Sequence, residues 1–224
     1  MPTQIPATHL RLRVWDLPTR LFHWALAISI IGAIVSVNIG GNAMAWHFRF
    51  GYAVLTLLLF RITWGFVGPR YARFASFPPS LGAAWRSLRD PQASVTPGHS
   101  ASAALSVYAL LLVVSIQVGT GLFSNDAIMW EGPLRAWVTS DQSDMITGWH
   151  LTNRFALIGL IALHLLAIIW WRLRHGKRLT RAMVTGDAEG LPPATEAARD
   201  DAGMRIRALV VLAICAGVVG YMVR

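Results

Sequence analysis

The stretch from Trp149 to Trp171 reads WHLTNRFALIGLIALHLLAIIWW, and it decides the fold class. Its length matches the run of about 20 apolar residues that an α-helix needs to cross the hydrocarbon core of a bilayer. Two histidines, His150 and His164, interrupt the apolar run. An ionisable side chain inside a membrane span is costly and is by default a candidate for function. The stretch therefore predicts a transmembrane helix that carries two functional side chains.

Four more apolar runs of this kind occur in the 224 residues: Leu21 to Ile39, Trp46 to Gly68, Ala101 to Phe123 and the shorter Arg207 to Met222. The chain is 54% hydrophobic and only 14% charged, whereas a soluble domain is about a quarter charged. We therefore expect an all-α integral membrane protein, a four-helix bundle with a fifth, C-terminal transmembrane helix. The expected parts are a cytoplasmic segment (1–20), the membrane domain (21–174), a cytoplasmic linker (175–206) and the last helix (207–224).

Positive charge alternates between the connecting segments. Lys and Arg number three before the first run, four between the second and third, and eight after the fourth. The segment 40–45 carries no charge, and the segment 124–148 has Arg135 against four carboxylates. Because cytoplasmic loops are enriched in Lys and Arg, we expect a cytoplasmic N-terminus in a bacterial inner membrane. Topology thus accounts for the net charge of +9, and a nucleic-acid partner is not needed to explain it.

Several chemistries are disfavoured by what the sequence lacks. A single cysteine, Cys215, cannot build a disulfide framework or a cysteine-ligated iron–sulfur cluster. The sequence contains no phosphate-binding loop, dinucleotide fingerprint, HExxH pair or serine nucleophile elbow. The first apolar run lacks a small-residue cleavage site, which indicates a retained helix. We also expect a short interfacial helix around Leu81 to Leu88 and a polar, mobile connection from Gly186 to Gly203.

Seven histidines occur in the chain, and their positions separate them into two groups. His9, His99 and His175 lie in the tail or in loops, where solvation or capping explains them, although His99 is a rival of His23 because both lie at inner ends of helices. The other four lie inside predicted spans: His23, His47, His150 and His164. A polar side chain in lipid must find a partner or lose several kcal/mol.

Depth in the bilayer sorts these four histidines into two pairs. His150 and His164 are 14 residues apart, which is close to four helical turns and a rise of about 21 Å. The predicted topology places His47 and His150 near the outer surface, and His23 and His164 near the inner surface. We call His47 and His150 the outer pair, and His23 and His164 the inner pair.

Two imidazoles on opposite sides of a flat site suit a six-coordinate haem iron, whereas a tetrahedral zinc needs more ligands. Haem propionates are anionic, and arginines occur at matching depths: Arg49 and Arg154 near the outer pair, Arg61 near the inner pair. Snorkelling to the interface explains Arg61 equally well. Gly51 lies one turn after His47 and could leave room for the porphyrin. Helix packing is the alternative for this glycine and for four others, Gly32, Gly119, Gly121 and Gly159.

Four stretches resemble a known family: RVWDLPTRLFHW, WHFRFGYAVLTLLLFRITWGFVGPRYARFASF, GHSASAALSVYALLLVVSIQVGTGLFSND, and ALHLLAIIWWR followed by RAMVTG. They are similar to the bacterial cytochrome b561 family, in particular to its nickel-iron hydrogenase cytochrome b subunits, over nearly Arg13 to Gly186. The resemblance implies a four-helix core with two b-type haems, ligated by His23, His47, His150 and His164, and it places the family arginine at Arg61. The fifth span and the sequence GWHLTN before the fourth span depart from the family pattern.

The resemblance also implies a function. Members of the family pass electrons between the quinone pool and a partner redox protein, which can be a hydrogenase, another dehydrogenase or a c-type cytochrome. We therefore expect an electron-transfer subunit of a quinone-linked complex, with His99, Asn125 and Asp126 as candidates for the quinone site. The acidic outer segment 124–148 either docks a basic partner domain or is simply solvated. The competing functions are a proton- or ion-conducting subunit with a histidine relay, and a membrane anchor without a cofactor.

Overall fold

The computed structural model describes residues 11–89, 97–189, 191 and 195–224, so His9 lies outside the described residues. Its helices and strands are β1 (Leu12–Arg13), α1 (Leu17–Ile39), α2 (Met44–Val67), α3 (Leu81–Arg89), α4 (Ala101–Gly121), α5 (Ser140–His175), α6 (Leu179–Thr185), β2 (Asp187–Ala188) and α7 (Ala202–Met222). Short 3-10 turns occupy Gly41–Ala43, Arg70–Ala72, Phe74–Ser76 and Arg135–Trp137.

Five of the described helices, α1, α2, α4, α5 and α7, are long and apolar enough to cross a membrane, as the sequence predicts. The longest, α5, has 36 residues and begins well before Trp149. A capping box at its start explains the extension, because the Thr139 side chain accepts from the Gln142 amide and the Gln142 side chain accepts from the Thr139 amide. The helix therefore continues through the polar segment that precedes the membrane.

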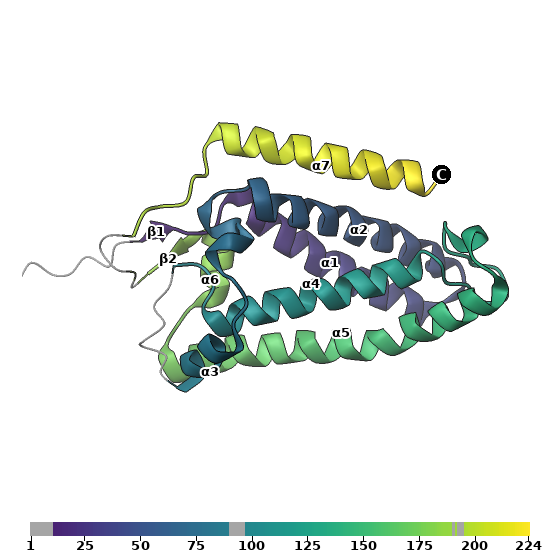
Figure 1. The fold of residues 1–224 in the computed structure, drawn as a ribbon, viewed down its shortest axis with the longest axis horizontal. Helices are drawn as coiled ribbons and strands as arrows, with labels where there is room; N and C mark the ends of the chain where they lie inside the picture. The colour runs from purple at the N-terminus through teal and green to yellow at the C-terminus, as the bar shows by residue number, and fades with distance from the viewer. Residues whose placement is uncertain (1–10, 90–96, 190, 192–194) are drawn as a thin grey trace, which may run out of the picture.

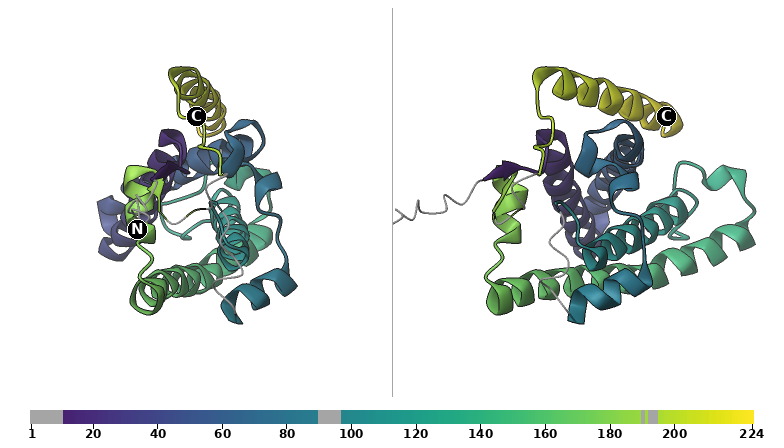
Figure 2. Two further views of the ribbon diagram at one scale, coloured as in Figure 1. Left: turned by 90° about the vertical axis from the view of Figure 1, so that its left-hand side faces the viewer. Right: turned by 60° about the vertical axis from the view of Figure 1, so that its left-hand side comes forward.

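The long helices form a bundle of two pairs with one helix outside it. Helix α1 packs along α2, α4 packs along α5, and α2 also contacts α4 and α7 (Figure 1). Seen along the bundle, α7 lies outside the other four helices (Figure 2, left). It attaches through Met204, Ala208 and Cys215, which are buried with Phe60 and Trp64 of α2. The fifth span is thus an addition to a four-helix core.

The middle of the four-helix core is apolar. Buried side chains from three helices meet there: Val54 and Leu58 from α2, Val114 from α4 and Leu157 from α5. Leu26 and Ile30 of α1 pack against the same cluster. Leu157 lies seven residues from both His150 and His164, so the cluster separates the outer and inner histidines, as the apolar sequence between them indicates.

At the N-terminal end of the bundle, segments that are far apart in the sequence form a cap. Strand β1 pairs antiparallel with β2, and Leu12 lies opposite Ala188 (Figure 1). Trp15, Tyr71 and Ala198 pack beside them in one buried cluster. The Ala198 amide donates to the Arg13 carbonyl oxygen at 2.7 Å. The described part of the connection between β2 and α7, expected to be mobile, is therefore packed against the protein.

Asp200 joins the cap to two of the long helices. Its carboxylate accepts from the Leu17 amide at the start of α1 and from Arg13 and Arg205, the latter in α7. Burial by itself would raise the pKa of Asp200, but the hydrogen bonds from Leu17, Arg205 and Arg13 outweigh it and lower that pKa. The carboxylate is therefore held ionised between the beginnings of α1 and α7.

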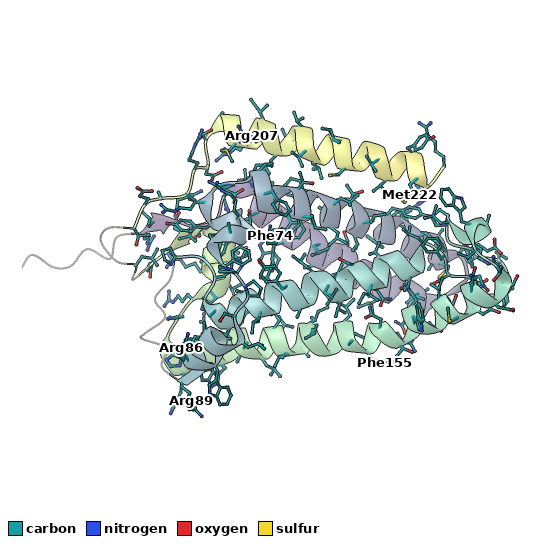
Figure 3. The ribbon with its side chains drawn as sticks, in the orientation of Figure 1. Phe74, Arg86, Arg89, Phe155, Arg207 and Met222 are labelled. Carbon is teal, nitrogen blue, oxygen red and sulfur yellow. The ribbon has the colours of Figure 1, made fainter. Side chains whose placement is uncertain are left out.

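Helix α3 is the short helix that the sequence predicts after the second span. It buries Ala84 and Ser87 and exposes Leu81 and Trp85. Figure 3 shows Arg86 and Arg89, the two cations of this helix, at the end of the molecule opposite Met222. An amphipathic helix with apolar and basic exposed residues suits the boundary between lipid and water.

Candidate functional site

The outer pair of histidines comes together between α2 and α5. The ring centroids of His47 and His150 are 6.2 Å apart, and their planes are almost perpendicular, at 88°. Because an imidazole nitrogen binds a metal ion at about 2 Å, two rings on opposite sides of one metal have centroids roughly 6 Å apart. The spacing of the outer pair therefore fits bis-histidine ligation of one iron.

Neighbouring helices orient both rings of the outer pair. Nδ1 of His47 lies 2.9 Å from the Ala33 carbonyl oxygen of α1, and Nδ1 of His150 lies 2.9 Å from the Gln117 carbonyl oxygen of α4. A carbonyl oxygen only accepts hydrogen bonds, so Nδ1 carries the proton in each ring and Nε2 keeps its lone pair. This is the tautomer that an axial ligand needs, with the second nitrogen anchored as is usual for metal-bound histidines.

Two glycines give space around the outer pair. A Cβ at Gly51, one turn after His47, would meet nothing within 4 Å, which leaves room beside that ring. A Cβ at Gly121 would lie 3.0 Å from the His150 ring, so this glycine allows α4 to approach the histidine.

The remaining three glycines behave differently. Gly32 lies beneath the Phe50 ring, 2.6 Å from where its Cβ would be, so it serves helix packing. Gly119 and Gly159 have open space around their Cβ positions.

The inner pair lies on the other side of the apolar cluster, toward the N-terminal cap. His23 of α1 and His164 of α5 are close enough to interact electrostatically. Nδ1 of His23 is buried and has no hydrogen-bond partner among the described residues. A buried polar atom without a partner is costly, and an axial ligand to a metal is one arrangement that satisfies an imidazole. Among the described residues no group of three or more His, Cys, Asp and Glu gathers as a closed zinc site would require.

Arg61 of α2 is buried at the same end of the bundle, with 4% of its surface exposed. Its guanidinium carbon lies 4.7 Å from the Phe74 ring centroid, and its Nη1 has no hydrogen-bond partner within the described part of the chain. The buried carboxylate of Asp16 acts on this positive charge electrostatically. Because the side chain is enclosed, snorkelling to water does not explain it. An anionic group such as a propionate would fit the unpaired Nη1.

A bundle with two pairs of histidines is compatible with several kinds of membrane protein, and a family match distinguishes them. The sequence model described as prokaryotic cytochrome b561 matches residues 14–186. The chain belongs to the prokaryotic cytochrome b561 family. It is thus a multi-pass membrane protein, a b-type cytochrome that carries haem b and takes part in electron transfer. A neutral imidazole with a lone pair on one ring nitrogen is the kind of axial donor that such a haem takes.

Curated relatives carry the same kind of name. Three are called probable Ni/Fe-hydrogenase B-type cytochrome subunit. That of Bradyrhizobium diazoefficiens is 23% identical over 79% of this chain and 85% of its own length. That of Rhizobium leguminosarum bv. viciae is 25% identical over 78% and 87%, and that of Azotobacter vinelandii is 23% identical over 77% and 86%. No solved structure gives a significant match.

The two arginines expected near the outer pair of histidines in this cytochrome are exposed. The Arg49 guanidinium lies 4.7 Å from the Trp46 ring centroid, and that of Arg154 lies 4.7 Å from Phe155. Figure 3 labels Phe155 on α5, and its side chain is 65% exposed. Both arginines thus stack on surface aromatics, in contrast to the enclosed Arg61.

His99, the rival of His23, lies in the aromatic part of the cap. Its ring centroid is 4.3 Å from Phe77 and 4.7 Å from Trp15. Burial lowers the pKa of His99 to about 3, and the positive charge of Arg61 acts in the same direction. The histidine is therefore neutral and tightly packed beside Arg61.

The other two candidates for a quinone site are used by the outer loop itself. Asn125 donates to Ser143 and Asp144, and Asp126 accepts from the amides of three following residues, Ile128, Met129 and Trp130. Both residues line a cavity of about 350 Å³. Their hydrogen-bonding capacity is largely spent on shaping the loop, which weakens the case for a quinone there.

Three polar residues beside the outer pair escaped the sequence analysis: Gln117, Thr120 and Asn153. The Gln117 side-chain nitrogen lies 3.1 Å from Nε2 of His150, and the Thr120 hydroxyl lies 3.3 Å from its Nδ1. Asn153 donates to the Gln117 side-chain oxygen at 2.7 Å. Two signals in the sequence could have found them: a glutamine within the apolar helix α4, and an asparagine about one turn after His150 in α5.

Proposed function

We propose that this cytochrome holds two haems b, one between His47 and His150 and one between His23 and His164. It passes electrons across the bacterial inner membrane, between the quinone pool and a partner redox protein. When bound, each haem supplies a reversible one-electron couple of its iron. The observation that carries the proposal is the outer pair, whose centroid spacing of 6.2 Å and anchored Nδ1 atoms suit one six-coordinate iron.

The polypeptide contributes position, tautomer and surroundings. His150 and His164 lie on one helix about four turns apart, so the two proposed sites are separated by about 21 Å along α5. The apolar cluster around Leu58, Val114 and Leu157 fills the space between them. A proton relay needs a nearly continuous file of polar groups, which this layer interrupts.

The sidedness follows from charge and from the cap. The N-terminal segment, the loop after α2 and the linker after α5 meet at one end of the bundle, and these segments carry most of the Lys and Arg. The positive-inside rule places that end in the cytoplasm. The inner pair, with Arg61, then lies near the cytoplasmic surface and the outer pair near the opposite surface.

The names of the relatives suggest the partner. They are called subunits of Ni/Fe-hydrogenases, so a hydrogenase is the first partner to test, with another dehydrogenase or a c-type cytochrome as alternatives. A quinone or quinol is the proposed small-molecule partner, and lipid surrounds the helices.

The experiment compares three histidines of the same helix, α5. We expect reduced-minus-oxidised spectra typical of haem b and about two haems per chain in the purified protein. His150→Ala and His164→Ala should each remove one of them, whereas His175→Ala, at the exposed end of the helix, should remove none. A colourless protein, or one that keeps both haems in the first two variants, would contradict the proposal.

A further inference from the structure

The outer loop, residues 122–139, connects α4 and α5 at the end of the bundle opposite β1 and β2 (Figure 1). Its tip is a tight turn built around Asp126. The Asp126 carboxylate accepts from three backbone amides, those of Ile128, Met129 and Trp130. The amide of Asp126 itself donates to the Trp130 carbonyl oxygen at 3.0 Å. These hydrogen bonds hold the tip in one shape.

The tip presents two adjacent apolar side chains to water. Ile128 is 89% exposed and Met129 is 74% exposed. Asn125, at the base of the tip, donates to Ser143, which lies six residues before Trp149 and therefore about 9 Å outside the apolar run of α5. The tip also has a carboxylate on each side of it, and charged groups are costly in lipid. An apolar pair held in water and flanked by charge is the pattern of a surface that a partner covers.

The carboxylates around the tip are not balanced by cations. Residues 122–148, which we call the outer face, carry Arg135 against four carboxylates: Asp126, Glu131, Asp141 and Asp144. Among the described residues every ion pair lies in the cap or at the start of α7, and none includes these four. Arg135 donates instead to the Val138 carbonyl oxygen and the Ser140 hydroxyl. The outer face is therefore negative, which is complementary to a basic partner.

The tip also lies close to the outer pair of histidines. Trp130 stacks on Phe48 of α2 with ring centroids 5.8 Å apart, and the Phe48 ring lies 6.2 Å from the His47 ring. Two aromatic rings thus connect the tip to a proposed haem ligand. The cavity of about 350 Å³ at the tip brings the two apolar side chains together with Glu131. A lysine or arginine of a partner suits such a cavity, because its aliphatic stem is apolar and its end is cationic.

We propose that the outer face is the docking surface for a one-electron redox protein that presents an apolar centre ringed by lysines or arginines. Ile128 and Met129 contribute to the apolar centre of this interface, and the carboxylates of the outer face form its polar rim. The inference rests on the proposed function, because the partner exchanges single electrons with the proposed outer haem. Docking at this end brings the partner to the outer pair and keeps it away from the inner pair.

The test uses the haem-loaded protein in nanodiscs of phosphatidylcholine, with ferricytochrome c as a small, basic one-electron probe. The reduced protein should reduce the probe with a second-order rate constant that falls as the ionic strength rises. We expect Glu131→Lys to lower both the affinity for the probe and this rate constant about three- to tenfold at low salt. Glu196→Lys is the matched control, because this glutamate is equally a surface residue but lies at the opposite end of the bundle, and it should change neither. Cytochrome c with acetylated lysines should bind weakly to every variant.

The apolar part of the surface needs a separate measurement. We expect Ile128→Ser with Met129→Ser to weaken binding of the probe at every salt concentration, because the lost contact is not electrostatic. Leu81→Ser, at an exposed leucine of α3, is the control and should leave binding unchanged.

The outcomes separate the inference from the function on which it rests. If Glu131→Lys and Glu196→Lys behave alike, the inference is overturned. It is also overturned if the double variant at Ile128 and Met129 binds the probe normally, as a tip that contacts lipid would. His150→Ala leaves the outer face intact, so it should bind the probe with unchanged affinity but reduce it more slowly. If that variant kept both haems, the proposed ligands would be wrong, and the measured affinities would still decide the inference.

Discussion

The outer and inner pairs differ in how far the protein alone orients their rings. Both outer histidines have Nδ1 on a backbone carbonyl of a neighbouring helix, at 2.9 Å in each case. In the inner pair, Nδ1 of His23 is buried with no hydrogen-bond partner among the described residues. The outer site is therefore shaped by hydrogen bonds between helices, whereas His23 of the inner site is held by packing without such a bond on Nδ1.

This difference has a physical consequence for the two proposed haems. A hydrogen bond from Nδ1–H to a carbonyl oxygen raises the basicity of an imidazole that binds the iron through its other nitrogen, and so lowers the midpoint potential. A positive charge such as that of Arg61 disfavours the oxidised iron, which carries more positive charge, and so raises the midpoint potential. Both effects point the same way. We expect the outer haem to have the lower midpoint potential, so that electrons entering at the outer pair move downhill toward the inner pair.

The largest effect should come from removing His23, a proposed ligand of the inner haem. We expect His23→Ala to remove the inner haem completely, while His99→Ala keeps two haems per chain, because His99 is packed between Trp15 and Phe77. The measurement is the haem-to-protein ratio together with the reduced-minus-oxidised spectrum. The reverse result would transfer the ligand role to His99 and remove the inner pair as defined here.

Filling the space beside His47 should act on the outer pair alone. A Cβ at Gly51 meets nothing within 4 Å, so Gly51→Leu should be tolerated by the helices but should compete with the porphyrin. We expect strong loss of the outer haem and full retention of the inner one. Gly159→Leu on α5 is the control, because its Cβ also meets nothing within 4 Å. Equal haem content in the two variants would show that the space beside Gly51 is not used.

Removing the buried guanidinium of Arg61 should narrow the difference between the midpoint potentials of the two haems, an effect smaller than the loss of a haem. We expect Arg61→Gln to lower the midpoint potential of the inner haem, since the positive charge that opposes the ferric state is gone. In a redox titration the outer haem should be unaffected. Arg154→Gln, at an exposed arginine that stacks on Phe155, should move neither potential. If Arg61→Gln shifted the midpoint potential of the outer haem instead, the assignment of Arg61 to the inner pair would be wrong.

The smallest effect concerns the cap above the inner pair. The pKa of Asp200 is lowered in the folded protein by Leu17, Arg205 and Arg13 against the effect of burial. Its stabilising contribution is therefore complete above the unfolded pKa of about 4 and is lost as the pH falls through the lower folded value.

We expect Asp200→Asn to cost about 1 to 3 kcal/mol, seen as a lower midpoint of thermal unfolding at neutral pH. The deficit relative to the unchanged protein should shrink under acid conditions. Glu196→Gln, whose ion pair with Arg70 is exposed, should cost little. A constant deficit from neutral pH to below 4 would show that the Asp200 charge is not the cause.

Much of this arrangement is already present in the one-dimensional pattern of the chain. Apolar runs indicate the spans, alternating Lys and Arg indicate their direction, and a rise of about 1.5 Å per residue gives each histidine a depth. The 14 residues between His150 and His164 therefore predict two levels before any contact is known. The structure brings His47 to His150 and His23 within electrostatic range of His164, as that sorting expects.

The sequence by itself thus determined depth, because position along the membrane normal follows from counting residues along a helix. It could not determine rotation or lateral distance, because these depend on how five separate helices pack. Only the tertiary structure decided that Ala33 and Gln117 present their carbonyls to the outer histidines, and that Asn153 orients the Gln117 amide. It also decided that the loop residue Phe74 covers Arg61, which a count along α2 leaves free to reach water.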